Sequence, residues 1–136
     1  MKSIKVVLDT NIWISFLITN NFNAIDQLIN EGKIKLLFSE ELIEEFVTVA
    51  KRPKFTKYFT NSDIIEIINL FNSYGKLVKV KTNNTDCRDL KDNFLLNLSI
   101  DGKADYLITG DSDLLILNKI KNTKIITFRE FIKIIT

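Results

Sequence analysis

Lys5–Trp13 reads KVVLDTNIW, a short apolar run that breaks abruptly into the polar residues Asp9, Thr10 and Asn11. A short apolar run bounded by turn-forming residues is typical of a buried strand that leads into a helix. The polar residues allow two interpretations. They are favoured helix N-caps that each contribute about 1 kcal/mol, and an aspartate at the end of a buried strand is also a candidate metal ligand. For a motif this short, capping outweighs catalysis by about two to one.

Short β-like runs alternate along the chain with longer helix-like segments. The expected strands are Ile4–Leu8, Ile34–Phe38, Leu77–Lys81, Tyr106–Thr109 and Lys124–Thr127. The expected helices are Ile12–Glu31, Glu40–Lys51, Asp63–Ser73, Asp89–Asp101, Asp113–Lys119 and Phe128–Ile135. Alternating strands and helices predict a parallel sheet covered on both faces. The expected fold class is therefore α/β, as a single three-layer domain over residues 1–136.

Composition restricts the chemistry more than the charge does. The 136 residues, 46% hydrophobic and 26% charged, are ordinary for one globular domain. With no histidine and only Cys87, the chain cannot build a usual zinc site, a catalytic triad with histidine, or an internal disulfide. The formal charge of +2 permits nucleic-acid binding without arguing for it. Chemistry must therefore come mainly from carboxylates, hydroxyls and amines.

The apolar runs are short. None approaches the roughly 20 residues needed to span a bilayer, and the N-terminus carries no apolar region of a signal peptide. The expected location is the cytoplasm, with no membrane partner.

Acidic side chains follow two expected strands at the points where these strands end. Asp9 follows the first strand, and the fourth runs through Thr109 into Asp111 and Asp113. In open parallel sheets, ligands bind at the carboxyl ends of the strands where the strand order reverses. Two acidic clusters in equivalent places therefore shift the balance from capping towards a functional site.

In two further acidic segments, residue spacing does not clearly show which acid belongs to a functional site. Within the helix after the second strand, Glu44 has mostly polar neighbours, whereas Glu45 borders the apolar stripe and is modestly favoured. Three aspartates precede or open the helix before the fourth strand: Asp86, Asp89 and Asp92. Spacing alone does not choose among them.

A basic segment follows the second expected helix. It consists of Lys51, Arg52, Lys54 and Lys57, interleaved with Phe55 and Tyr58. Cations can position a nucleic-acid backbone and aromatic rings can stack on bases. A solvated helix end with its rings in the core is an equally good interpretation.

Several motifs together resemble the PIN-domain ribonucleases, and particularly the bacterial and archaeal PIN toxins of the VapC group. These motifs are LDTNIWIS (8–15), SEELIEEFVTVAKRPKF (39–55), RDLKDNFLLNLSIDGKADYLITGDSDLL (88–115) and IITFREFI (125–132). The resemblance implies a five-stranded sheet of order 3-2-1-4-5. It places the family's acids on Asp9, Glu45, Asp92 and Asp111, with Asp113 as an additional acid. Leu90 replaces a proline often found before the third acid, a change expected to alter a turn.

The resemblance implies an endoribonuclease that depends on Mg²⁺ or Mn²⁺. Unit charges about 4 Å apart repel by roughly 4 kcal/mol at an effective dielectric near 20, so a cluster of carboxylates needs protons or a cation. Oxygen ligands suit these hard ions, and one or two of them can activate water against a phosphodiester. The expected ligands are Asp9, Asp92 and Asp111, with Glu45 as a ligand or an orienter of water and Asp113 as a support. The residues expected to hydrogen-bond these carboxylates are Thr10, Asn11 and Thr109.

The resemblance also implies partners and leaves alternatives open. Toxins of this type act on RNA, form homodimers and are neutralised by an antitoxin protein. A catalytically inactive PIN-like RNA-binding module is the main alternative. An aspartate-nucleophile phosphatase is less favoured, because Asn11 stands where that class usually has a second aspartate. A phospho-receiver domain is disfavoured because the third expected strand runs into Thr82 rather than an aspartate.

Overall fold

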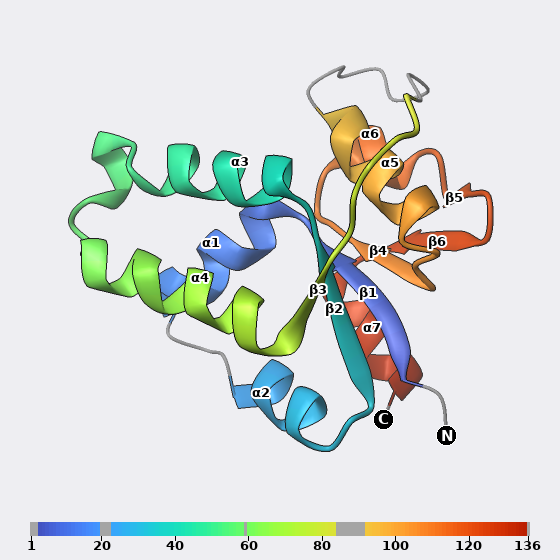
Figure 1. The fold of residues 1–136 in the computed structure, drawn as a ribbon, viewed down its shortest axis with the longest axis horizontal. Helices are drawn as coiled ribbons and strands as arrows, with labels where there is room; N and C mark the ends of the chain where they lie inside the picture. The colour runs from blue at the N-terminus through green and yellow to red at the C-terminus, as the bar shows by residue number, and fades with distance from the viewer. Residues whose placement is uncertain (1–2, 20–22, 59, 84–91, 136) are drawn as a thin grey trace.

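The computed structural model of the protein describes residues 3–19, 23–58, 60–83 and 92–135 (Figure 1). Its strands are β1 (Ile4–Leu8), β2 (Ile34–Phe38), β3 (Gly75–Leu77), β4 (Tyr106–Ile108), β5 (Lys119–Ile120) and β6 (Thr123–Ile126). Its helices are α1 (Thr10–Thr19), α2 (Asn23–Asn30), α3 (Glu40–Ala50), α4 (Asn61–Tyr74), α5 (Asn93–Asp101), α6 (Ser112–Leu115) and α7 (Phe128–Ile135). A 3-10 turn, η1 (Pro53–Phe55), follows α3.

The sheet has six strands in the order β3-β2-β1-β4-β6-β5. Five of them are parallel and follow the expected order, with β6 in the fifth position. The expectation of five strands is wrong by one, because β5 forms a short antiparallel hairpin with β6. The strand order reverses between β1 and β4, so the carboxyl ends of these two strands flank the position at which open sheets bind ligands.

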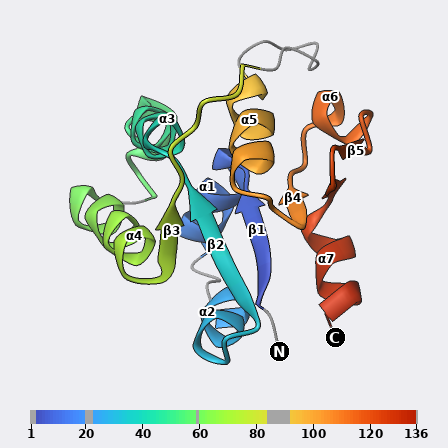
Figure 2. The ribbon, with the colours of Figure 1, turned by 45° about the vertical axis from the view of Figure 1, so that its right-hand side comes forward.

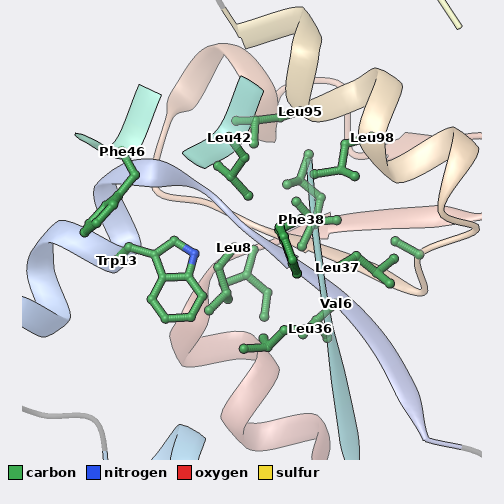
Figure 3. Close-up of a cluster of buried hydrophobic side chains, with 14 of the residues drawn as sticks. Val6, Leu8, Trp13, Leu36, Leu37, Phe38, Leu42, Phe46, Leu95 and Leu98 are labelled. Atoms are coloured by element: carbon green, nitrogen blue, oxygen red, sulfur yellow. The ribbon is translucent and has the colours of Figure 1, made fainter. Parts of the chain in front are cut away.

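Helices cover both faces of the sheet. On one face, α1 and α7 meet through the rings of Phe16 and Phe128, whose centroids are 5.2 Å apart. On the other face, α5 packs so closely that a Cβ on Gly102 would lie 2.8 Å from Leu37 Cδ1. The buried cluster includes Leu8 of β1 and Trp13 of α1 (Figure 3). The three-layer architecture is therefore confirmed.

The first expected helix, Ile12–Glu31, corresponds to two described helices. These are α1 (Thr10–Thr19) and α2 (Asn23–Asn30). Residues 20–22 lie outside the described residues.

The expected strand Leu77–Lys81 is shifted towards the N-terminus. Pairing with β2 covers Gly75–Leu77, and the N–H of Val78 adds one bond to the Phe38 carbonyl. Beyond this point the Asp101 carboxylate accepts the N–H groups of Lys81 and Thr82, at 2.6 and 2.8 Å. These amides are therefore not available to a sheet ladder.

The expected helix Asp113–Lys119 is also too long. The helix α6 ends at Leu115, and Asn118 has a φ of 64°, which does not continue a helix. Lys119 instead begins β5. In the described part of the chain, no helix combines the length and the apolar character needed to cross a membrane.

Candidate active site at the carboxyl edge of the sheet

The candidate site lies where β1 and β4 end side by side. Leu8 pairs with Ile108, and the next residue, Asp9, donates its N–H to the Ile108 carbonyl at 3.0 Å. Thr109 follows Ile108, so the two polar residues leave the sheet at the same level. The acids that follow β1 and β4 in sequence are thereby brought to one place.

A chain of hydrogen bonds joins these acids. The Thr109 hydroxyl donates to Asp9 Oδ2 at 2.6 Å and accepts the N–H of Asp111 at 3.0 Å. The second oxygen of Asp9 accepts the N–H of Asn11 at 3.3 Å. Asp111 Oδ1 accepts the N–H of Asp113 at 2.9 Å. Thr109 is fully buried, so this chain fixes the Asp9 carboxylate from inside the fold.

Capping and site formation use the same residues. Asp111 is the N-cap of α6, with extended backbone angles (φ −78°, ψ 121°). The main-chain carbonyl of Asp9 accepts the N–H of Ile12 at 2.9 Å and so starts α1. Each turn is therefore closed by hydrogen bonds to the main chain. At the same time Asp9 Oδ2 faces Thr109 at the end of β4, and Asp111 Oδ1 faces the start of α6. The two interpretations of the LDTN motif are compatible.

The Asp9 carboxylate is buried and lies among like charges. Its exposed fraction is 4%. Burial is the largest influence on the pKa of Asp9 and raises it; the hydrogen bonds from Thr109 and Asn11 oppose this, and the charges of Asp111 and Glu45 raise it further. The net shift is upward from the ordinary value. Negative charge therefore accumulates here, which favours a cation.

Glu45 and Asp92 lie at the same end of the molecule. Glu45 is half-buried, whereas its neighbour Glu44 is exposed. A surface hollow of about 350 Å³ beside Glu45 is also lined by Phe94, which is two residues beyond Asp92. The helix α5 starts at the edge where β1 and β2 end, as Figure 2 shows. Asp92, the residue before α5, is therefore on the site's side of the sheet.

The carboxylate oxygens at this edge of the sheet are suitable ligands for a hard cation, and they lie at the position where open sheets bind ligands. All the acids at this edge offer carboxylate oxygens, which Mg²⁺ and Mn²⁺ prefer. Among the described residues, however, no group of three or more acidic or cysteine side chains is arranged so that it could hold an ion. Asp9 is anchored by its two hydrogen bonds, so coordination would require the other side chains to turn towards it.

The remaining predicted residues are placed as follows. Thr10 is buried, and its hydroxyl makes no hydrogen bond to any residue that the structure describes. Asn11 contributes its main-chain N–H. Asp86, Asp89 and Leu90 lie outside the described residues. The hollow beside Glu45 is also lined by Glu41, Glu44 and Thr48. None of these three was predicted as a site residue, although Glu41 at i−4 and Thr48 at i+3 from Glu45 were available signals.

The basic segment is not part of the carboxylate cluster. It lies beyond the C-terminal end of α3, in and after η1, on the connection between α3 and α4 (Figure 1). Lys54 Nζ lies 5.0 Å from the ring centroid of Phe55, and Lys57 Nζ lies 5.2 Å from that of Tyr58. Tyr58 is 51% exposed, so one of the two rings does not belong to the core.

Comparison with known proteins identifies the family. The PIN domain family model matches residues 5–113, which include every proposed acid from Asp9 to Asp113. The uncharacterized protein MJ1680 of Methanocaldococcus jannaschii is 38% identical over 141 residues, covering 96% of this chain and 90% of that protein. The structure of the RRP44 PIN domain of T. brucei is similar with a TM-score of 0.49 and 14% identity, covering 96% and 80% of the two chains. PIN domains are generally nucleases. Because the family model matches well over half of its residues, this chain belongs to the PIN domain family.

Proposed function

We propose that this protein is a cytoplasmic endoribonuclease that depends on a divalent metal ion and hydrolyses RNA phosphodiester bonds. One observation carries the proposal: Thr109 ties the buried Asp9 carboxylate to Asp111 at the strand-order reversal, within the electrostatic field of Glu45. An anionic site of this kind is unfavourable for a polyanionic substrate unless a cation is bound. The family's nuclease character agrees with that requirement.

Each acid has a proposed role. Asp9, Asp92 and Asp111 would hold one or two ions of Mg²⁺ or Mn²⁺, Glu45 would bind an ion or orient the attacking water, and Asp113 would support Asp111. When bound, such ions lower the pKa of water and neutralise charge on the leaving oxygen. Thr109 and Asn11 hold Asp9 in one orientation, so that it does not need to reorganise during the reaction.

Substitution of the acids by their amides tests this proposal. In Asp111→Asn the amide oxygen can still cap α6, because asparagine is as good an N-cap as aspartate. Cleavage of RNA in Mg²⁺ should fall by at least about 100-fold while the fold survives. Asp9→Asn and Glu45→Gln should behave similarly, and Glu66→Gln, at an exposed position on α4, is the control. Full activity in Asp111→Asn would reject the assignment.

We assign the basic segment to substrate binding. Lys51, Arg52, Lys54 and Lys57 are exposed on the α3–α4 connection, and the Lys54 and Lys57 ammonium groups lie over aromatic rings. Phosphate contacts made equally in the ground and transition states change KM rather than kcat. Arg52→Gln with Lys54→Gln should therefore raise KM for RNA and leave kcat unchanged; a change confined to kcat would contradict this role.

The biological role that we propose is that of a toxin, active as a homodimer and neutralised by an antitoxin protein. The resemblance of the four sequence motifs to VapC-like toxins supports this role. Expression of the chain alone should arrest growth, and co-expression of a small adjacent reading frame should relieve the arrest. Unimpaired growth with a purified protein that cleaves RNA would reject the toxin role and retain the nuclease.

An inactive RNA-binding module remains the second candidate. It is favoured by the absence, within the described ranges, of an acidic group already arranged to hold an ion. Calorimetry separates the two candidates, because the nuclease should bind Mg²⁺ or Mn²⁺ with a heat signal that Asp111→Asn loses. RNA binding without metal binding would identify the inactive module.

A further inference from the structure

Lysines from three neighbouring strands project from one face of the sheet. Lys5 pairs with Lys35, and Lys76 pairs with Leu37. Paired residues of parallel strands project to the same face, as do residues two apart along one strand. Leu37 faces α5, because it is the nearest neighbour of a Cβ built on Gly102. The three lysines are therefore on the face that α5 covers.

The helix α5 does not cover the whole face of the sheet, and it leaves the amino ends of β1 and β2 uncovered. Figure 2 shows that α5 ends part-way along the sheet and leaves the lower parts of β1 and β2 uncovered on this side. Lys35 and Lys76 are exposed, as is Lys103, which follows α5. Lys103 and Lys5 line one surface hollow of about 400 Å³. We call these four residues, Lys5, Lys35, Lys76 and Lys103, the lysine face.

The lysine face forms no ion pair with a described residue, although Asp105 lines the same hollow as Lys5 and Lys103. None of the four has a carboxylate oxygen within 4.0 Å among the described residues, whereas Lys33 pairs with Glu31 at 3.0 Å. Of the nearby acids, Asp105 accepts the main-chain N–H of Lys5, and Asp101 accepts main-chain N–H groups beside β3. Lysines placed directly opposite each other, as Lys5 and Lys35 are, destabilise a sheet.

We infer that the lysine face is a second contact surface for the phosphate backbone of RNA, on the α5 side of the sheet. Lys5 and Lys35 lie near the amino ends of β1 and β2, and Lys76 lies further along, opposite Leu37. The inference rests on the proposed ribonuclease function. The five residues of β1 extend about 17 Å at roughly 3.3 Å each, so a longer RNA lying along the α5 side can reach both ends. The alternative role of these lysines is to keep the uncovered part of the sheet from aggregating. With that role alone, the lysines would contribute nothing to RNA binding.

The salt dependence of RNA binding distinguishes these two roles. Binding of a labelled RNA of about 30 nucleotides, roughly 100 Å of stacked strand, is measured in EDTA over a range of salt concentrations. Lys35→Gln with Lys76→Gln should lower the slope of log K against log salt by about 1.4, or about 0.7 for each lost phosphate contact. The control is Lys121→Gln with Lys133→Gln, which removes two exposed lysines elsewhere and should leave the slope unchanged.

The outcomes separate this inference from the proposed function. An unchanged slope in a folded Lys35→Gln and Lys76→Gln protein overturns the lysine face, even where the wild type cleaves RNA. A reduced slope supports it, even where cleavage in Mg²⁺ is absent and the proposed function fails. An equal loss of binding to polyglutamate would assign the face to acidic proteins and overturn it. The unfolding temperature should stay constant or rise, since the Lys5–Lys35 repulsion is removed.

Discussion

Thr109 is the residue that connects the ends of β1 and β4 by hydrogen bonds. Its hydroxyl donates to Asp9 in a buried hydrogen bond and accepts from the N–H of Asp111 in a partly buried one. We expect Thr109→Val, which keeps the shape but removes the hydroxyl, to lower the free energy of unfolding by about 1–3 kcal/mol. RNA cleavage should fall by about 10–100-fold, because Asp9 loses the group that orients it.

Thr109→Ser is the matched control for this substitution, because it keeps the hydroxyl and loses only a methyl group. Denaturant unfolding and initial cleavage rates measure the two effects separately. Serine should recover most of the activity. Equal activity in the valine and serine variants would show that the hydroxyl does not position Asp9.

Asp101 has a structural role that depends on pH. Its carboxylate accepts the N–H groups of Lys81 and Thr82 and the hydroxyl of Thr82. Burial alone would raise the pKa of Asp101, but these hydrogen bonds and the charge of Lys81 outweigh it and place the pKa below the ordinary 3.8. A lowered pKa stabilises the fold above pH 3.8, and this stabilisation is lost as the pH falls through the folded-state value.

We therefore expect Asp101→Asn to cost about 1–2 kcal/mol at neutral pH, since one amide oxygen replaces a charged acceptor. The difference from the wild type should narrow as the pH falls below 3.8. Urea unfolding of both proteins at several pH values measures this difference in the free energy of unfolding. Glu66→Gln, at an exposed position on α4, should change stability by less than about 0.5 kcal/mol. A difference that is independent of pH would contradict the role of the ionised carboxylate.

At the scale of elements, the close contact between α5 and the sheet depends on Gly102. This glycine is needed for its lack of a side chain and not for an unusual backbone conformation. Gly102 has a φ of −83°, but a Cβ there would lie 2.8 Å from Leu37 Cδ1 and 3.0 Å from the Leu98 carbonyl oxygen. We expect Gly102→Ala to destabilise the protein by about 1–3 kcal/mol through overpacking. A Cβ on Gly110 meets nothing within 4 Å, so Gly110→Ala should unfold like the wild type. Equal unfolding midpoints for the two variants would show that α5 can move away without cost.

The elements were predictable where the pattern was local. The apolar runs predicted the described helices and five of the six strands by type, whereas β5 was missed because Lys119 was assigned to the preceding helix. The PIN resemblance implied the order of the five parallel strands. The ends of elements depended on distant partners. Asp101 takes the amides of Lys81 and Thr82 although about twenty residues separate them, and no window of sequence around β3 contains that information.

The acids of the candidate site were predictable to different degrees. Asp9 and Asp111 follow strands, and their meeting required only the position of β1 beside β4. The half-burial of Glu45 agrees with its place at the border of the apolar stripe. The choice of Asp92 came from the resemblance, and its catalytic role stays a prediction. The lysine face was not visible in the sequence, because it depends on the register of three strands.

For the whole molecule, the buried acid predicts a metal-dependent stability. Ionised Asp9 is held in a buried site near Asp111 and Glu45, so a cation that binds there stabilises the native state. We expect Mg²⁺ or Mn²⁺ at about 100 times its dissociation constant to add about 2.7 kcal/mol and to raise the unfolding temperature. The shift should be absent in Asp9→Asn and in Asp111→Asn. A shift of the same size in these variants would place the ion elsewhere.

The formal charge of +2 conceals how unevenly the charges are distributed. Asp9, Asp111 and Glu45 gather where the parallel strands end, whereas Lys5 and Lys35 pair near where they begin. A polyanion is repelled by the first cluster and attracted by the second. In the field of a polyanion, these two clusters would turn the lysine face forward before contact. The molecule would then meet its substrate in a preferred orientation, and raised ionic strength would remove that preference before it removed binding.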